Sequence, residues 1–200
     1  MEENEEKGLA NLFFETNILT RIKRSGNMLV NNPTQDNVSD HAFRTMFIAQ
    51  ILAKIEKVNV GKILQMCILK NLPKTRIQEL HKVASHYINE EKASENVFKD
   101  QTNLFPKEMR SEIRSLYDEL GEKQTKEATI CRDASYLAEV LSTKESIERG
   151  VDMTDWIKNL RKAIKLNSSR KIMEAILESK STDWWKNLKY IPEIERGLQK

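Results

Sequence analysis

A short apolar segment, Ile63 to Leu72, most constrains what this 200-residue chain can fold into. It reads I-L-Q-M-C-I-L-K-N-L, and Pro73 directly after it cannot continue a helix. Seven of its ten residues are apolar, which predicts a short helix buried on most sides. Helical spacing puts Lys70 and Asn71 on apolar stripes of this helix, and two buried polar side chains mark a candidate site. The alternative is that the helix end emerges into solvent and Lys70 extends to water.

The rest of the chain repeats this helical pattern. Apolar residues recur at a spacing of three and four, and no stretch alternates as a strand does. Two hundred residues suit one domain with a real core. The sequence therefore predicts an all-α protein of seven to nine helices, in one bundle over residues 9–190. A mobile acidic N-terminus, 1–8, and a C-terminal tail, 191–200, are expected on either side.

Caps and breakers place the individual helices. Ser39 is the predicted N-cap of a helix that continues to Ile55. After Pro73, one helix is expected from Thr75 to Asn89, and the charged, poorly periodic residues 90–105 are expected to form a linker. A longer helix is predicted from Thr125 to about Glu148, with a mainly apolar face.

Composition narrows the class of protein. No apolar run is long enough to span a bilayer, and the start M-E-E-N-E-E-K is acidic, unlike a signal peptide. Cys67 and Cys131 both lie among apolar residues, as buried reduced thiols of a cytosolic protein do. The net charge of +3 is too small to indicate nucleic-acid binding by itself. We expect a cytoplasmic protein with no membrane partner.

Few residues suggest chemistry on their own. His41 follows N-V-S-D and falls in the first buried turn of its helix, where a lone histidine is more often a core residue than a ligand. His81 and His86 are five apart and therefore lie on different helix faces. The chain has no H-E-x-x-H, no cysteine cluster with zinc spacing, no P-loop and no dinucleotide-binding motif. The residues alone leave the function open.

A late helical stretch is strongly basic. It can contact a phosphate backbone, although such a run is more often a solvated helix face. A nucleic-acid-binding accessory protein is therefore one alternative. The basic residues are Lys158, Arg161, Lys162, Lys165, Arg170 and Lys171.

Three motifs, in order, resemble a known family. They are R-S-G ending at Gly26, N-V-S-D-H-A-F-R around His41, and L-K-N-L-P-K-T around Lys70. This order is similar to that of the HD-domain phosphohydrolases, and within them to the 5′-deoxynucleotidase branch, which reads R-T-G, S-V-S-E/D-H-S-F-R, L-H-D-L-P-E-A and later D-A-D-x-L. The likeness extends from about Leu9 to Leu188. It implies a helical bundle, metal-dependent hydrolysis of nucleoside 5′-monophosphates, and a homodimer.

The residues that match the family's site depart from it. His41 matches the first metal-ligand histidine and is kept. The histidine and aspartate that name the family fall on Lys70 and Asn71. The glutamate that positions the attacking water falls on Lys74, and a downstream acidic residue near the substrate is matched by Glu79.

The last metal-ligand aspartate of the family falls on Ser135 in D-A-S-Y-L, while Asp133 matches the aspartate before it. Periodicity does not choose between Asp133 and Ser135, since each flanks the apolar stripe of its helix. At most two of the four expected ligands remain, His41 and Asp133. A hydrolytic dication needs several donors, and ammonium groups repel it. We expect no cofactor, and Mn²⁺, Co²⁺ or Mg²⁺ only if the protein is active after all.

Three hypotheses result. The first is a pseudoenzyme with a positively charged pocket that binds a phosphate or nucleotide, or that serves as an interaction subunit. An equally open version has the pocket plugged, with Lys70 paired to Asp133 or Glu79. The second hypothesis is an active 5′-deoxynucleotidase, and the third is the nucleic-acid-binding protein. The candidate ligand-binding residues are Arg24, His41, Lys70, Lys74 and Glu79, and no sequence feature identifies the interface of a dimer.

Overall fold

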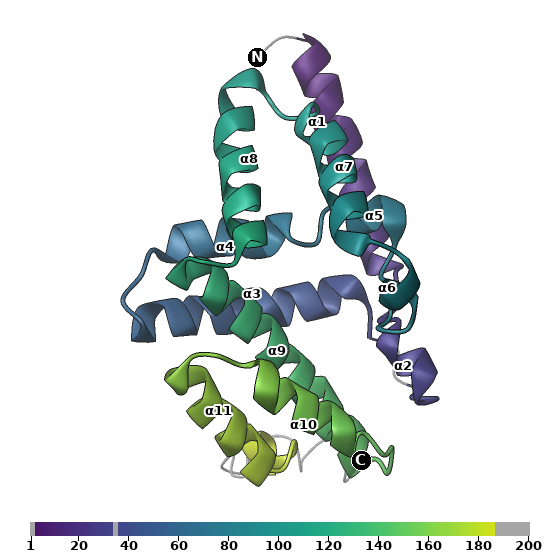
Figure 1. The fold of residues 1–200 in the computed structure, drawn as a ribbon, viewed down its shortest axis with the longest axis vertical. Coiled ribbons are helices and arrows are strands. Elements are labelled where there is room, and N and C mark those ends of the chain that lie inside the picture. Colours follow the sequence, from purple (N-terminus) through teal and green to yellow (C-terminus); the bar gives the residue numbers. More distant parts are fainter. Residues whose placement is uncertain (1–2, 34–35, 187–200) are drawn as a thin grey trace, which may run out of the picture.

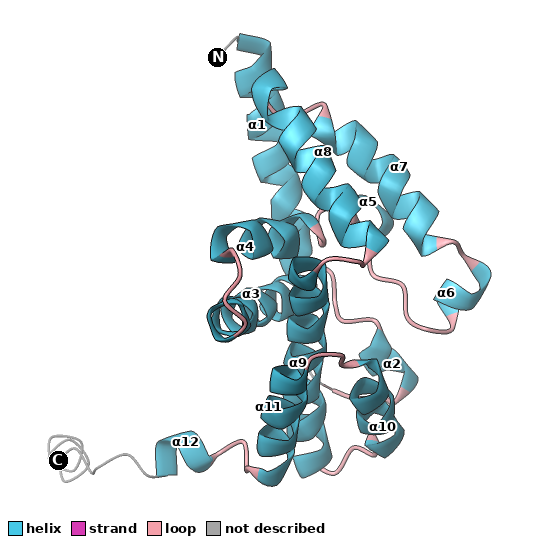
Figure 2. Cartoon of the chain, turned by 60° about the vertical axis from the view of Figure 1, so that its left-hand side comes forward, coloured by secondary structure: helices cyan, strands magenta, loops and turns pink. Residues whose placement is uncertain are grey.

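The computed structural model describes residues 3–33 and 36–186, and over these residues the fold is helical without a β-sheet (Figure 1, Figure 2). Eight helices have ten or more residues, which confirms the predicted all-α bundle of seven to nine helices. None of the helices described is long and apolar enough to cross a membrane. The long helices are α1 (Glu3–Thr16), α3 (Val38–Ile55), α4 (Val60–Leu69), α7 (Glu90–Thr102), α8 (Lys107–Glu122), α9 (Lys126–Glu148), α10 (Thr154–Ala163) and α11 (Asn167–Glu178), and the single turns are η1 (Asn17–Thr20), α2 (Gly26–Leu29), α5 (Lys74–Ile77), α6 (Ala84–Tyr87) and α12 (Asp183–Lys186).

Helix α9 is the centre of the fold. It crosses α3 and also packs against α4, α8, α10 and α11 (Figure 1). Its buried residues, among them Ile130, Ala134 and Leu137, occupy several faces, as a helix enclosed by others requires. Thr125 caps it by accepting a hydrogen bond from the Ala128 N–H, which confirms the predicted start. The middle of α9 therefore lies where side chains from several helices meet.

Helices α3 and α4 pack together beside α9. The N-cap of α3 is Asn37, so the prediction of Ser39 is wrong. The Asn37 side chain accepts the Asp40 N–H, and the Asp40 carboxylate accepts the Asn37 N–H in return. Ser39 donates its hydroxyl to the Asn37 side chain and so supports the cap. This capping box fixes the first turn of α3, which carries His41.

The segment after Pro73 differs most from the prediction. The expected helix from Thr75 to Asn89 is interrupted, because α5 ends at Ile77 and Gln78 takes a positive φ of 63°. The expected linker over residues 90–105 is instead mostly helix α7. Only a narrow face of α7 is buried, around Phe98, which stacks on Tyr117 of α8 with ring centroids 3.7 Å apart. A narrow buried face leaves little apolar periodicity to detect.

Part of the predicted N-terminal segment, 1–8, is helical. Helix α1 begins at Glu3, whereas residues 1–8 were expected to be mobile, and an ion pair joins Lys7 to Glu3 one turn away. At Gly8 a Cβ atom would lie 3.0 Å from the Leu104 carbonyl oxygen, so glycine lets α1 approach the end of α7 closely. The predicted tail, 191–200, lies outside the described residues.

Candidate functional site

Four separate parts of the chain supply the side chains of the candidate site. Arg24 precedes α2, and the first turn of α3 carries His41. The end of α4 and the following turn carry residues 70–79, and α9 carries residues 133–139. The packing of α3 and α4 against α9 brings these parts together.

His41 and Ser135 meet directly in this site. The His41 Nε2 atom lies 3.0 Å from the Ser135 hydroxyl oxygen, and His41 is only 4% exposed. Burial, followed by the positive charges of Arg24 and Lys70, holds the pKa of His41 well below its ordinary value, so the ring is neutral. The structure thus selects Ser135 rather than Asp133 as the α9 residue that faces His41.

Asp133 lies outside the site, which corrects its prediction as a residual metal ligand. Its buried carboxylate accepts hydrogen bonds from the backbone N–H groups of Lys165 and Leu166, at 3.1 Å and 2.8 Å, just before α11. Residues two apart on a helix point about 200° apart, so Asp133 cannot share the direction of Ser135. Asp133 therefore anchors the start of α11.

An ion-pair network fills the space around His41. Arg24 donates to the carboxylates of Glu79 and Glu139, with an N–O distance of 2.6 Å to Glu139. Lys74 donates to the same Glu79 oxygen as Arg24, at 2.7 Å, and the second Glu79 oxygen accepts the Ser25 N–H at 3.1 Å. Three of the predicted ligand-binding residues, Arg24, Lys74 and Glu79, therefore bind each other.

The electrostatics of this network favour its charged form. Burial raises the pKa of Glu79, but the positive charges of Lys74 and Arg24 outweigh it and hold that pKa below its ordinary value. Sequence reasoning missed Glu139, although it lies one helical turn after Ser135 and so shares its face. The site contains two acidic groups, Glu79 and Glu139, and three basic groups, Arg24, Lys70 and Lys74. The two carboxylates therefore neutralise most of the positive charge that was predicted for the pocket.

Of the two side chains predicted to point inward, Lys70 and Asn71, the structure gives Asn71 a partner within its own helix. Asn71 is 3% exposed, and its side-chain amide donates to the Cys67 carbonyl at 3.1 Å, closing the end of α4. Burial lowers the pKa of Lys70, whose side chain makes no hydrogen bond or ion pair with another residue in the described part of the chain. The predicted pairing of Lys70 with Asp133 or Glu79 is therefore wrong.

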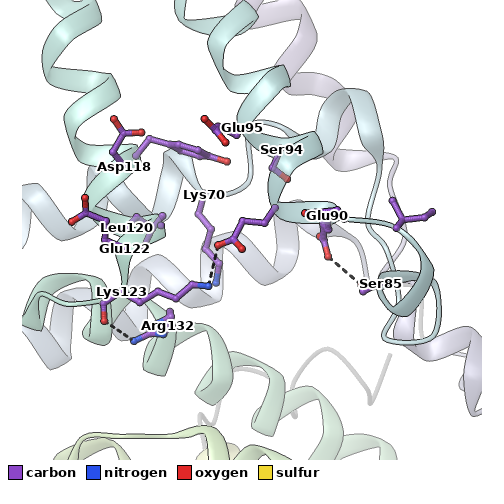
Figure 3. Close-up of a pocket in the computed structure, with 15 residues that line it drawn as sticks. Lys70, Ser85, Glu90, Ser94, Glu95, Asp118, Leu120, Glu122, Lys123 and Arg132 are labelled. Atoms are coloured by element: carbon purple, nitrogen blue, oxygen red, sulfur yellow. Dashed lines mark hydrogen bonds and ion pairs between the residues drawn. The ribbon is translucent and has the colours of Figure 1, made fainter.

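Lys70 also borders an open groove of about 940 Å³ between α7 and α8 (Figure 3). In Figure 3 Lys70 lies between the two sides of the groove, with Glu122 and Lys123 on one side and Glu90 and Ser94 on the other. Lys123 is paired with Glu91 at 3.2 Å. His41, Lys74 and Glu79 do not line this groove, so it is separate from the ion-pair network.

The residues present do not fit a hydrolytic metal ion. No group of three or more His, Cys, Asp or Glu side chains that could hold one occurs in the described ranges. The His41 Nε2 atom is engaged by Ser135, and Glu79 and Glu139 are engaged by Arg24. A dication there would also face the positive charges of Lys70 and Lys74.

Two cysteines lie beside the site. Cys67 of α4 and Cys131 of α9 are buried free thiols, and their sulfur atoms are 3.1 Å apart. The sequence could not show whether these two thiols are close in space, and the structure places them in contact.

The basic residues of α10, α11 and the loop between them are partly neutralised by carboxylates. Arg161 makes two 2.8 Å contacts with Glu174, and Lys158 pairs with Asp155 at 2.8 Å. Arg170 donates to the Ile164 carbonyl. Lys162, Lys165 and Lys171 complete the predicted patch, which is thus interleaved with carboxylates.

Comparison with known proteins gives consistent results. A family model described as HD domain matches residues 16–179. A human 5′-deoxynucleotidase is 23% identical over 129 residues, covering 64% of this chain and 62% of the relative, and the mouse protein is 22% identical. The chain thus spans less than two thirds of the length of these curated relatives.

Solved structures share the fold over more of the chain. A protein from Pyrococcus horikoshii has a TM-score of 0.72 and 25% identity, over 86% of this chain and 99% of that one. A predicted metal-dependent phosphohydrolase from Magnetospirillum magnetotacticum has a TM-score of 0.66 and 17% identity, over 88% of this chain and 95% of that one.

Proposed function

This chain belongs to the HD-domain family, and we propose that it is a catalytically inactive member whose former metal pocket is closed by its own side chains. The observation that carries this proposal is the network in which Arg24 and Lys74 bind Glu79 and Arg24 also binds Glu139. The side chain of Glu79 is only 8% exposed. The network therefore occupies the space beside His41 with groups that already satisfy each other.

The chemistry of the individual positions supports the same conclusion. At the place of the water-positioning glutamate, Lys74 offers an ammonium group that is already donating to Glu79 and cannot accept a proton. Ser135 offers a neutral hydroxyl in place of a carboxylate. His41 keeps a nitrogen donor, but one neutral donor does not hold a hydrolytic dication against nearby positive charge.

The first functional prediction is the absence of phosphatase activity. Deoxynucleoside 5′-monophosphates incubated with the protein and Mn²⁺, Co²⁺ or Mg²⁺ should release no more phosphate than with a His41→Ala variant. Colorimetric detection of phosphate checks this result. Turnover that depends on His41 would instead support the alternative of an active 5′-deoxynucleotidase.

A second candidate function, binding of a phosphorylated small molecule, is favoured by Lys70. The Lys70 side chain is half-buried, borders the groove, and lacks an ion pair within the described residues. A buried cation gains most from a charged partner. Arg132 lines the same groove and can add a second donor.

Lys70→Met tests this binding, because it keeps the length of the side chain and removes its charge. In calorimetric titration with inorganic phosphate or a deoxynucleoside monophosphate, we expect an affinity at least about tenfold weaker than wild type. Lys123→Met is the matched control, since Lys123 lines the same groove but is already paired with Glu91. Equal binding by wild type and Lys70→Met, or none by either, would contradict the candidate.

Two further proposals concern location and assembly. We infer a cytoplasmic location from the two buried free thiols. A homodimer remains part of the proposal. No observation favours nucleic-acid binding over these functions, because Lys158 and Arg161 are engaged by carboxylates.

A further inference from the structure

Cys67 of α4 and Cys131 of α9 are the only cysteines of the chain, and they touch each other. They are 64 positions apart in the sequence, yet their sulfur atoms lie 3.1 Å apart. Both side chains are 0% exposed and belong to the hydrophobic core. Packing alone does not require this contact, because another small apolar side chain fills such a position as well as cysteine does. Two thiols in contact can, however, be joined by oxidation.

We propose that Cys67 and Cys131 are a redox-active dithiol, which a peroxide converts into a disulfide between α4 and α9, and that the charge of Lys70 promotes this reaction. The inference concerns a modification of the chain and does not rest on the proposed loss of phosphatase activity. A reducing compartment keeps such a pair as thiols until an oxidant arrives.

The positions of the two sulfur atoms favour this bond. A disulfide bond is about 2.05 Å long, so each sulfur has to move by roughly half an ångström. Helices α4 and α9 already pack directly against each other, and the bond therefore links neighbouring elements. Since both side chains are 0% exposed, the thiol of a second folded chain cannot reach either of them. The bond therefore forms within one chain.

The surroundings of the pair make Cys131 the more reactive thiol. Lys70 lies about one helical turn after Cys67, and the Cys67 thiol donates a hydrogen bond to the Cys131 sulfur. This hydrogen bond lowers the pKa of the Cys131 thiol, as does the charge of Lys70, whereas burial raises it. The thiolate and not the thiol attacks an oxidant, so Cys131 is expected to react first.

The groove between α7 and α8 gives a small oxidant a short route to the pair. Lys70 and Arg132 both line this groove, and Arg132 directly follows Cys131 in the chain (Figure 3). Hydrogen peroxide is little larger than a water molecule, so a small local opening of the groove wall is enough to admit it.

The oxidation has two steps. The Cys131 thiolate attacks one oxygen of hydrogen peroxide, the O–O bond breaks, and the departing hydroxide takes a proton to become water, which leaves a sulfenic acid on Cys131. The Cys67 sulfur then attacks the sulfenic sulfur, the S–O bond breaks, and the hydroxyl group departs as water with the Cys67 proton. The two sulfurs together lose two electrons, and one peroxide is reduced to two waters.

The disulfide joins two walls of the site. The Cys67 carbonyl accepts the Asn71 side-chain amide at the end of α4. Ser135, which contacts His41, lies one turn after Cys131 on α9. A covalent link at this height prevents α4 and α9 from separating, so the oxidised protein keeps the closed arrangement of the site.

Mass spectrometry of the full chain tests the modification. The reduced protein is treated with hydrogen peroxide under native conditions, then denatured and alkylated with N-ethylmaleimide. We expect a product that is lighter by two hydrogen atoms, takes up no maleimide, and migrates as a single chain on a non-reducing gel. Dithiothreitol should restore two reactive thiols. Because the chain has only two cysteines, this result identifies the pair, and Cys67→Ala is the control that cannot form the bond.

The rate of disulfide formation tests the contribution of Lys70. Lys70→Met should slow the reaction by at least about fivefold, and Lys70→Arg, which keeps the charge, should stay close to wild type. Lys123→Met is the matched control, because Lys123 lines the same groove but is paired with Glu91. Circular dichroism checks that each variant is folded.

Three results would overturn the proposal. The first is wild type that still takes up two maleimides after native peroxide treatment, which would make the pair an inert part of the core. The second is a disulfide that links two chains instead of closing within one. The third is a Lys70→Met variant that is oxidised as fast as wild type.

Discussion

Replacing Asp133 with alanine is expected to lower the free energy of unfolding by about 3–5 kcal/mol. The Asp133 carboxylate is 1% exposed and accepts the backbone N–H groups of Lys165 and Leu166. Alanine leaves these donors without their acceptor beside a small cavity, and unpaired buried donors are costly. Urea denaturation followed by circular dichroism measures the change.

The control for this prediction is Asp155→Ala. The Asp155 side chain is 88% exposed, and its ion pair with Lys158 is on the surface. Its loss should change the free energy of unfolding by no more than about 0.5–1 kcal/mol. Equal effects of the two substitutions would show that Asp133 does not anchor α11.

Glu79→Gln should be the second most damaging change, lowering the free energy of unfolding by about 2–4 kcal/mol at neutral pH. It leaves the buried Arg24 and Lys74 short of a negative partner, although Glu139 still pairs with Arg24. Glu174→Gln, which breaks an exposed pair with Arg161, is the matched control and should have a small effect.

The difference between wild type and Glu79→Gln should depend on pH. The pKa of Glu79 is lower in the folded protein than its ordinary value of 4.5, so folding favours the ionised form. The resulting stability is fully present above pH 4.5 and is lost as the pH falls through the lower folded pKa. Denaturation curves between pH 7 and acid pH should therefore converge, and a difference that stays constant would contradict the ion-pair account.

The sequence predicted those parts of the fold whose signals are local. The predicted start at Thr125 placed α9 correctly, and the apolar segment Ile63 to Leu72 identified α4, which spans Val60–Leu69. The resemblance correctly paired His41 with position 135. Helix α7 was missed because its buried face is narrow and the remainder of its surface is charged.

The ion pairs of Glu79 with Arg24 and Lys74 could not be predicted from the sequence, for a different reason. They depend on the break at Gln78, where the chain leaves α5 and carries Glu79 to Arg24 and Lys74. Periodicity predicted a continuous helix there. The exposure of Phe43, Phe47 and Ile51 on α3 could not be predicted either, because helical spacing identifies apolar residues but does not show which of them other elements cover.

Phosphate release is the most direct test of whether this HD-domain chain hydrolyses nucleotides. Wild type is compared with a variant carrying Lys70→His, Asn71→Asp, Lys74→Glu and Ser135→Asp, and the human 5′-deoxynucleotidase serves as positive control. We expect no release by wild type above the His41→Ala background with Mn²⁺, Co²⁺ or Mg²⁺. Release by wild type that His41→Ala abolishes would contradict it.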